Sequence, residues 1–166
     1  YEMYCQLLDS AVRKLRGEQP EQKVQTHLEL GVGGHLPKSY VPSDRQRMEV
    51  YRRLAHCRND EDIAQLETDL ADSYGPLPEQ ARMLLDQAQL RIWASAYAIR
   101  TVLAQPPDLV FTVENMKRFT PLAQRAQAGP GIVRVIDERT VHFRLTPAYF
   151  EPATLMSVLR KLLRPK

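Results

Sequence analysis

Apolar residues recur at three- and four-residue steps through much of the chain before residue 100, which is the spacing of one face of an α-helix. The pattern predicts helices over about residues 2–16, 44–57, 60–74 and 78–98, the last with Pro78 at its first position and an apolar stripe that runs to Ile99. Residues 24–32 alternate loosely instead, which predicts a short strand ahead of the second helix.

After residue 99 the chain reads mainly as strands. Runs over 100–104, 109–113, 131–136 and 140–145 are β-like, and the last two predict an antiparallel hairpin. Thr120 and Pro121 mark the start of a short helix over about 121–127, and Glu151 with Pro152 the start of a final helix. This order predicts an α+β fold: a helical N-terminal half, then a small, mainly antiparallel sheet with packed helices, β-β-α-β-β-α.

The stretch SYVPSDRQR, residues 39–47, leads into the second helix. Pro42 keeps Val41 out of a helix and favours extended backbone there. Ser43 is predicted to cap the helix, with Gln46 at capping-box spacing. Tyr40 and Val41 are therefore expected to be buried anchors that position the helix.

Composition and charge narrow the function classes. Hydrophobic residues at 43% suffice for a core, no apolar run is long enough for a membrane span, and the N-terminus does not resemble a signal peptide. Two cysteines without motif spacing indicate reduced thiols and a cytoplasmic location. The net charge is −3 over residues 1–75 and +6 over residues 76–166. A basic nucleic-acid-binding module therefore stays open as an alternative, although the arginines of the second half are scattered.

Residues suited to catalysis or metal binding are not grouped. The four histidines are dispersed, no Gly-x-x-x-x-Gly-Lys loop is present, and capping explains Ser43 beside Asp44. A hydrolase with paired carboxylates stays open, but nothing favours it. We therefore expect no catalytic, cofactor or metal residues, no enzymatic activity and no tight DNA binding by this chain.

Asp69 and Asp72 form the candidate interaction site. They lie three residues apart, on one face near the C-terminal end of the predicted helix 60–74. Acidic groups there oppose the helix dipole, at a cost of roughly 0.3–1 kcal/mol each. A local rule that is broken without local benefit often marks a functional surface, and the alternative is a solvated helix end.

Two segments, SYVPSDRQRMEVYRRLA and LETDLADSYGPLPEQARMLLDQAQLR, resemble the C-terminal domain of bacterial transcription-repair coupling factors. The resemblance covers about residues 36–100, and Ser43 stands where that family usually has Asp. The matching positions include Tyr40, Val41, Pro42, Ser43, Arg47, Tyr51, Asp69, Asp72, Tyr74, Gly75 and Pro78.

This resemblance implies a function that composition does not show. Full-length members are ATP-driven translocases on double-stranded DNA that displace stalled RNA polymerase and recruit UvrA. Their last domain is not catalytic: in the resting protein it clamps a UvrB-like N-terminal module, masks the UvrA-binding surface and restrains the motor. The resemblance places residues 1–20 as a linker helix leaving the translocase module and residues 21–166 as the regulatory domain. It also implies that Asp69 and Asp72 face basic residues of the UvrB-like module.

Overall fold

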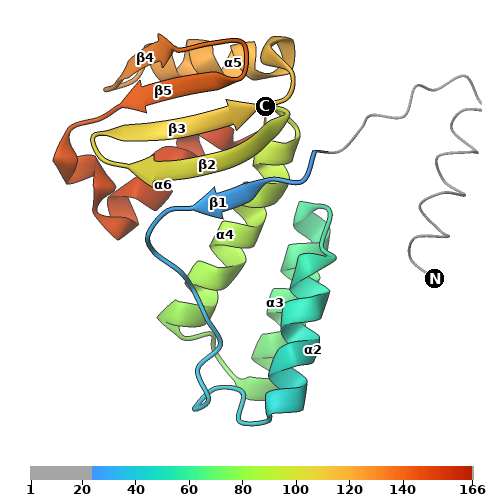
Figure 1. Ribbon diagram of the computed structural model, residues 1–166. Coiled ribbons are helices and arrows are strands. Elements are labelled where there is room, and N and C mark those ends of the chain that lie inside the picture. The colour runs from blue at the N-terminus through green and yellow to red at the C-terminus, as the bar shows by residue number, and fades with distance from the viewer. Residues whose placement is uncertain (1–23, 166) are drawn as a thin grey trace, which may run out of the picture.

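The computed structural model describes residues 24–165, arranged as a helical part and a sheet part (Figure 1). The strands are β1 His27–Glu29, β2 Ile99–Gln105, β3 Asp108–Val113, β4 Ile132–Val135 and β5 Thr140–Arg144. The helices are α2 Asp44–Ala55, α3 Asp60–Tyr74, α4 Glu79–Ser95, α5 Met116–Gln127, the 3-10 turn η1 Pro147–Phe150 and α6 Pro152–Leu163. The predicted helix over residues 2–16 lies outside the described residues.

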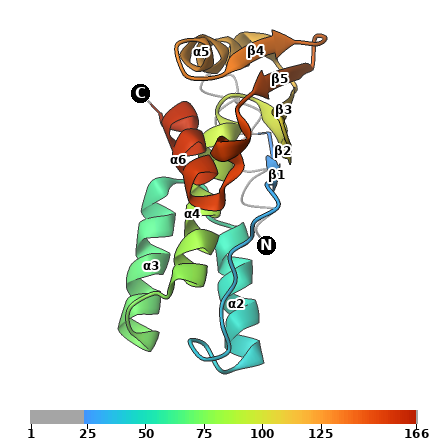
Figure 2. The same cartoon turned by 90° about the vertical axis from the view of Figure 1, so that its left-hand side faces the viewer.

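The sheet has the strand order β1-β2-β3-β5-β4. β1 pairs with β2 in parallel, and every other neighbouring pair is antiparallel. α4, α5 and α6 lie on one side of the sheet, so its opposite face has no described helix over it (Figure 2). The prediction of an α+β fold with a mainly antiparallel sheet is confirmed.

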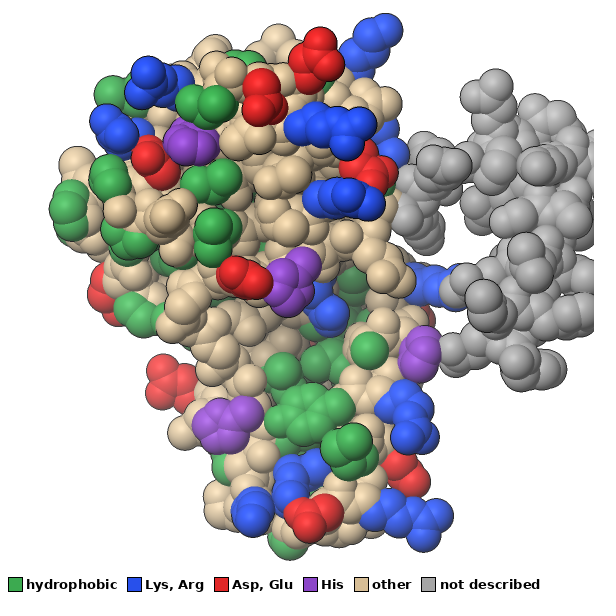
Figure 3. Space-filling view, viewed as in Figure 1, with side chains coloured by type: hydrophobic (Ala, Val, Ile, Leu, Met, Phe, Trp, Pro, Cys, Tyr) green, Lys and Arg blue, Asp and Glu red, His purple; other side chains and the backbone are tan. Residues whose placement is uncertain are grey.

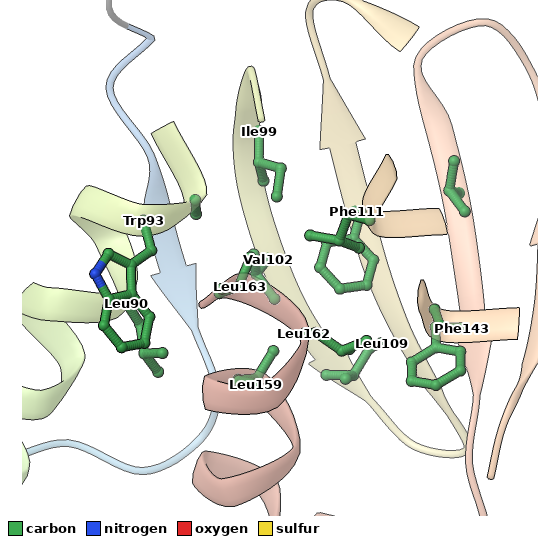
Figure 4. Packing of buried hydrophobic residues seen from close by; sticks show 14 of the residues in the cluster. Leu90, Trp93, Ile99, Val102, Leu109, Phe111, Phe143, Leu159, Leu162 and Leu163 are labelled. Carbon is green, nitrogen blue, oxygen red and sulfur yellow. The ribbon is translucent and has the colours of Figure 1, made fainter. Parts of the chain in front are cut away.

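Two hydrophobic clusters stabilise the fold, and α4 belongs to both. The larger cluster lies between the sheet and the helices on its covered face, with side chains from α4, β2, β3, β5 and α6 (Figure 4). The smaller one joins α2, α3 and α4 through residues such as Leu54, Leu66 and Leu85. Ile92 of α4 packs against both clusters, so α4 is the common support of the two parts.

The predicted cap residues stand at two helix starts. The Ser43 side chain accepts a hydrogen bond from the Gln46 amide at 3.3 Å, and Asn59 accepts one from the Asp62 amide at 2.8 Å. Each bond satisfies an amide that has no acceptor within its helix. The predicted starts of α2 and α3 are therefore confirmed, whereas α2 ends at Ala55, two residues before the predicted end.

The observed helix α4 is shorter than the predicted helix 78–98, and Ile99 was wrongly assigned to its apolar stripe. α4 ends at Ser95, Ala98 adopts a positive φ of 58°, and Ile99 begins β2. The Ala98 carbonyl accepts a hydrogen bond from the Glu114 amide at 2.8 Å. The turn directs the Ile99 side chain into the core between the sheet and the helices. Ile99 therefore continues the apolar spacing of the helix, although it belongs to β2.

The start of α5 was also predicted wrongly. The helix begins at Met116, where the Asn115 side chain accepts from the amides of Lys117 and Arg118 at 3.0 and 3.3 Å. Pro121 therefore lies inside the helix rather than at its start. A buried apolar stripe, which includes Phe119, outweighs the hydrogen bond that proline cannot donate.

Candidate protein-interaction site

The C-terminal end of α3 is fastened by the stretch that precedes α2. The Tyr40 hydroxyl donates to the Gly75 carbonyl at 2.8 Å and lies 3.2 Å from the Leu70 carbonyl. Its ring packs against the Tyr74 ring, with centroids 5.7 Å apart. Burial raises the pKa of Tyr40 above its ordinary value, and the hydroxyl is a hydrogen-bond donor at neutral pH in either case. Gly75 ends the helix with a φ of 88°, a conformation that favours glycine.

The anchor prediction for SYVPSDRQR is confirmed for Val41, which is fully buried, and only in part for Tyr40, which is half-buried. Arg47 donates to the carbonyls of Val41 and Pro42 at 2.8 and 3.3 Å, and it also pairs with Asp44. The arginine of the motif therefore fixes the backbone of Val41 and Pro42 where it leads into α2.

Two further motif residues connect segments that are distant in sequence. The Tyr51 hydroxyl accepts a hydrogen bond from the Leu36 amide at 2.9 Å. The Tyr74 hydroxyl donates to Gln46 Oε1 at 2.9 Å, so Gln46 binds α3 with its side-chain oxygen. The motif residues thus hold the start of α2 against the end of α3.

Asp69 already has a basic partner within this domain, whereas the resemblance implies that it faces basic residues of the UvrB-like module. Arg53 of α2 places Nη2 2.6 Å from Asp69 Oδ2, and Gln65 donates to Asp69 Oδ1 at 2.9 Å. The hydrogen bond from Arg53 lowers the pKa of Asp69, with a smaller contribution from Gln65. Both carboxylate oxygens are therefore occupied, although the side chain remains 42% exposed.

Asp72 is exposed, and within residues 24–165 its carboxylate has no hydrogen bond or ion pair. The last turn of α3 contains no basic residue that would offset this charge. One turn of α3 thus presents an occupied carboxylate, Asp69, beside a free one, Asp72.

Sequence reasoning missed the basic residues that surround this acidic end. Arg53 lies on α2 and Arg82 on α4, where its Nη1 is 2.7 Å from Glu67 Oε1 of α3. No sequence signal joins these residues, because each pair spans two helices and depends on how the helices pack.

The arginines of the basic C-terminal half are largely engaged within the domain. Arg100 pairs with Glu114 at 2.7 Å, and Arg144 with Asp108 at 3.2 Å. Arg125 donates to the Leu162 carbonyl at 2.6 Å. Acidic and basic side chains are interspersed on the face viewed in Figure 3. Because Arg100, Arg125 and Arg144 are bonded within the domain, they do not form a continuous basic stripe.

Metal binding and membrane insertion have little support in the described region. No group of three His, Cys, Asp or Glu side chains in residues 24–165 could hold a metal ion. None of the described helices has the length and apolar character of a membrane span. Cys57 is a free, half-buried thiol whose pKa is raised by burial, while Cys5 lies outside the described residues.

Comparison with known proteins gives a consistent result. The family model of the TRCF domain matches residues 30–123. The chain is 35% identical over 128 residues to the transcription-repair-coupling factor of Mycobacterium tuberculosis strain CDC 1551 / Oshkosh, covering 77% of this chain and 10% of that protein. It is 33% identical over 150 residues to the transcription-repair-coupling factor of Escherichia coli K12, covering 87% of this chain and 12% of that protein.

A solved structure carries the same fold. The crystal structure of the C-terminal domain of a transcription-repair coupling factor superposes with a TM-score of 0.70 at 16% identity, covering 86% of this chain and 94% of that one. The chain spans about a tenth of the length of the curated relatives it matches. Because the family match extends over more than half of the chain, this protein belongs to the TRCF domain family, that of the C-terminal domain of transcription-repair coupling factors.

Proposed function

We propose that this chain is the non-catalytic regulatory domain of a bacterial transcription-repair coupling factor. In the resting protein it clamps a UvrB-like N-terminal module, which masks the surface that binds UvrA and restrains the DNA translocase. RNA polymerase is then an indirect partner, reached through the translocase in the cytoplasm. The observation that carries the proposal is the end of α3, where the free carboxylate of Asp72 lies one turn from Asp69 on a rigidly held helix.

Rigidity and charge both favour docking at this end of α3. The contacts of Tyr40 and Gln46 fix the helix end before a partner arrives, so little ordering entropy is lost on binding. An arginine of the partner can form charge-assisted hydrogen bonds with Asp72 directly. Asp69 must share its carboxylate between Arg53 and the partner, or exchange one for the other.

The double substitution Asp69→Ala with Asp72→Ala in a full-length protein tests the clamp. Loss of two charge-assisted contacts, each worth roughly tenfold, is expected to shift the closed-to-open ratio by up to about a hundredfold. UvrA affinity and basal ATP hydrolysis should therefore rise together. The melting temperature of the isolated chain should change little, because the Arg53–Asp69 pair is about half-exposed.

A matched control removes two exposed carboxylates elsewhere, with Glu61→Ala at the opposite end of α3 and Glu138→Ala in the β4–β5 turn. This variant should bind UvrA as the unchanged protein does. Equal UvrA affinity of the Asp69/Asp72 variant and the control, with both folds intact, would reduce the acidic end of α3 to a solvated surface.

Arg53→Gln gives a change of the opposite sign. Without the guanidinium, Asp69 keeps only the Gln65 hydrogen bond and is free to bind an arginine of the partner. We expect a tighter clamp, weaker UvrA binding and lower basal ATP hydrolysis than in the unchanged full-length protein. Increased UvrA binding would mean that Arg53 itself contacts the partner module.

The proposed function assigns no catalysis to this chain. ATP hydrolysis and duplex binding belong to the translocase module of the longer protein. The purified chain is therefore expected to hydrolyse no ATP and to show no tight, salt-dependent binding to duplex DNA. Either activity in a correctly folded sample would contradict the assignment.

A further inference from the structure

The free edge of the sheet at β4 has the features of a strand-addition site. The Ile136 amide donates to the Thr140 carbonyl of the β5 side at 2.9 Å, and Arg134 lies opposite His142 in the same register. Backbone groups along an antiparallel strand alternate between its two neighbours. Arg134 and Ile136 thus point their backbone groups towards β5, whereas Val133 and Val135 point theirs away from it.

These outward backbone groups have no partner in the described part of the chain. Within residues 24–165, the amides and carbonyls of Val133 and Val135 form no hydrogen bond with β5 or with any other element. β4 is the last strand of the sheet, and in both ribbon views no described element lies beyond it on the free side (Figures 1 and 2).

The side chains at this edge are unusually apolar for an exposed strand. Ile132, Val135 and Ile136 are 68%, 62% and 48% exposed, and among the described residues Met48 of α2 is the other exposed large hydrophobic. Edge strands are normally protected by charge, proline or a covering segment, because an open apolar edge pairs with other chains. Three exposed apolar side chains on one short edge strand are expected of a binding surface.

We propose that the free edge of β4 binds an extended segment of a protein partner as an added strand, with an acidic side chain of that segment facing Arg134. The outward groups of Val133 and Val135 would supply the backbone hydrogen bonds, as in other complexes formed by strand addition. Ile132 and Ile136 share a face of the strand with Arg134, so the complementary segment has an acidic residue with apolar residues two positions before and after it.

The charge of the occupant follows from the ion pairs around Arg134. Asp108 neutralises Arg144 of β5, with Asp108 Oδ1 3.2 Å from Arg144 Nε. Oδ2 of the same carboxylate lies 3.7 Å from His142 Nδ1. Arg134 is exposed and has no ion pair within residues 24–165. A carboxylate on the incoming strand would therefore meet an arginine that the domain leaves unpaired.

A second copy of this chain fits the edge less well. If two β4 strands pair antiparallel through the outward groups of Val133 and Val135, Arg134 faces Arg134, Ile132 or Ile136 of the second copy, depending on the register. In none of these registers does it meet a carboxylate of the opposing strand. The charges thus favour a different, acidic segment.

This surface is separate from the acidic end of α3. It lies in the sheet part, whereas α3 packs with α2 and α4 in the helical part (Figure 1). A failed test at β4 therefore leaves the clamp proposal untouched, and the converse also holds.

Binding of a designed peptide to the complete chain tests the inference. The probe is the terminally blocked peptide Thr-Val-Thr-Glu-Thr-Val-Thr, and its matched control has Lys in place of Glu. Two-dimensional NMR should show that the Glu peptide slows hydrogen exchange at the amides of Val133 and Val135, whereas Arg134 is already bonded to β5. The Lys peptide should bind about fivefold more weakly.

Three variants complete the test. Arg134→Glu should invert the preference between the two peptides, and Val135→Pro should abolish binding because it removes an outward amide. Met48→Thr, at the similarly exposed apolar position on α2, should leave binding unchanged. Absence of binding by the unchanged chain, unchanged exchange at Val133 and Val135, an unaltered preference in Arg134→Glu, or dimerisation through β4 would each overturn the proposal.

Discussion

Replacing Tyr40 by phenylalanine removes one oxygen atom from the contact that fastens α3. The hydroxyl lies 2.8 Å from the Gly75 carbonyl and 3.2 Å from the Leu70 carbonyl, and it has a single proton to share between them. The ring and its packing on Tyr74 are kept, since the centroid separation of 5.7 Å does not involve the hydroxyl. The substitution therefore isolates the hydrogen bond from the packing.

The expected cost follows from the burial of these groups. A net hydrogen bond contributes about 1 kcal/mol to the free energy of unfolding. The Leu70 carbonyl lies near the C-terminal end of α3 and also accepts from its own helix, and Gly75 is half-buried, so water replaces part of the lost bond. We expect the free energy of unfolding to fall by about 1 kcal/mol, which corresponds to a melting temperature lower by about 2–4 °C for a chain of this size.

Equilibrium unfolding in urea, with thermal melting as a second measure, gives the magnitude. Tyr97→Phe is the matched control, because its hydroxyl lies 3.4 Å from the Arg164 carbonyl, a long and exposed contact. This control should cost less than about 0.5 kcal/mol. If Tyr40→Phe costs no more than Tyr97→Phe, the Tyr40 hydroxyl does not fasten the end of α3, and the rigidity argued for the docking surface loses its support.

Two further predictions concern packing and pH. Gly34→Ala should lower the free energy of unfolding by about 1–3 kcal/mol or more, because the added Cβ would lie 2.1 Å from the Leu84 amide nitrogen. The control Gly33→Ala would place its Cβ where no atom lies within 4 Å, so it should be nearly neutral in urea unfolding. Burial raises the pKa of Asp86, and this effect outweighs Arg160 and Arg82, which lower the pKa. At pH values between the ordinary pKa and the raised one, the folded chain therefore binds more protons than the unfolded chain. The free energy of unfolding therefore falls as pH rises through that window, and Asp86→Asn should stabilise the chain at about pH 7 but not at about pH 3; an equal effect at both values would contradict this reasoning.

Local signals along the chain determined most of the elements. Ser43 and Asn59 are cap residues whose side chains each accept from the amide three positions away, so their helix starts could be predicted without the fold. The signal failed where two patterns overlapped. Ile99 continues the helical spacing of α4, and Pro121 resembles a helix start, but the sheet and the buried stripe of α5 decided both positions.

The sequence also determined which carboxylates stand at the end of α3, because Asp69 and Asp72 are placed by the period of one helix. Only the tertiary structure decided their partners. Arg53 reaches Asp69 from α2, and β1 pairs with β2 although about 70 residues separate Leu28 from Val102. The free edge of β4 likewise depends on the strand order. Capping and periodicity act within a few residues, whereas these pairings depend on how whole helices and strands pack, and no local pattern contains that information.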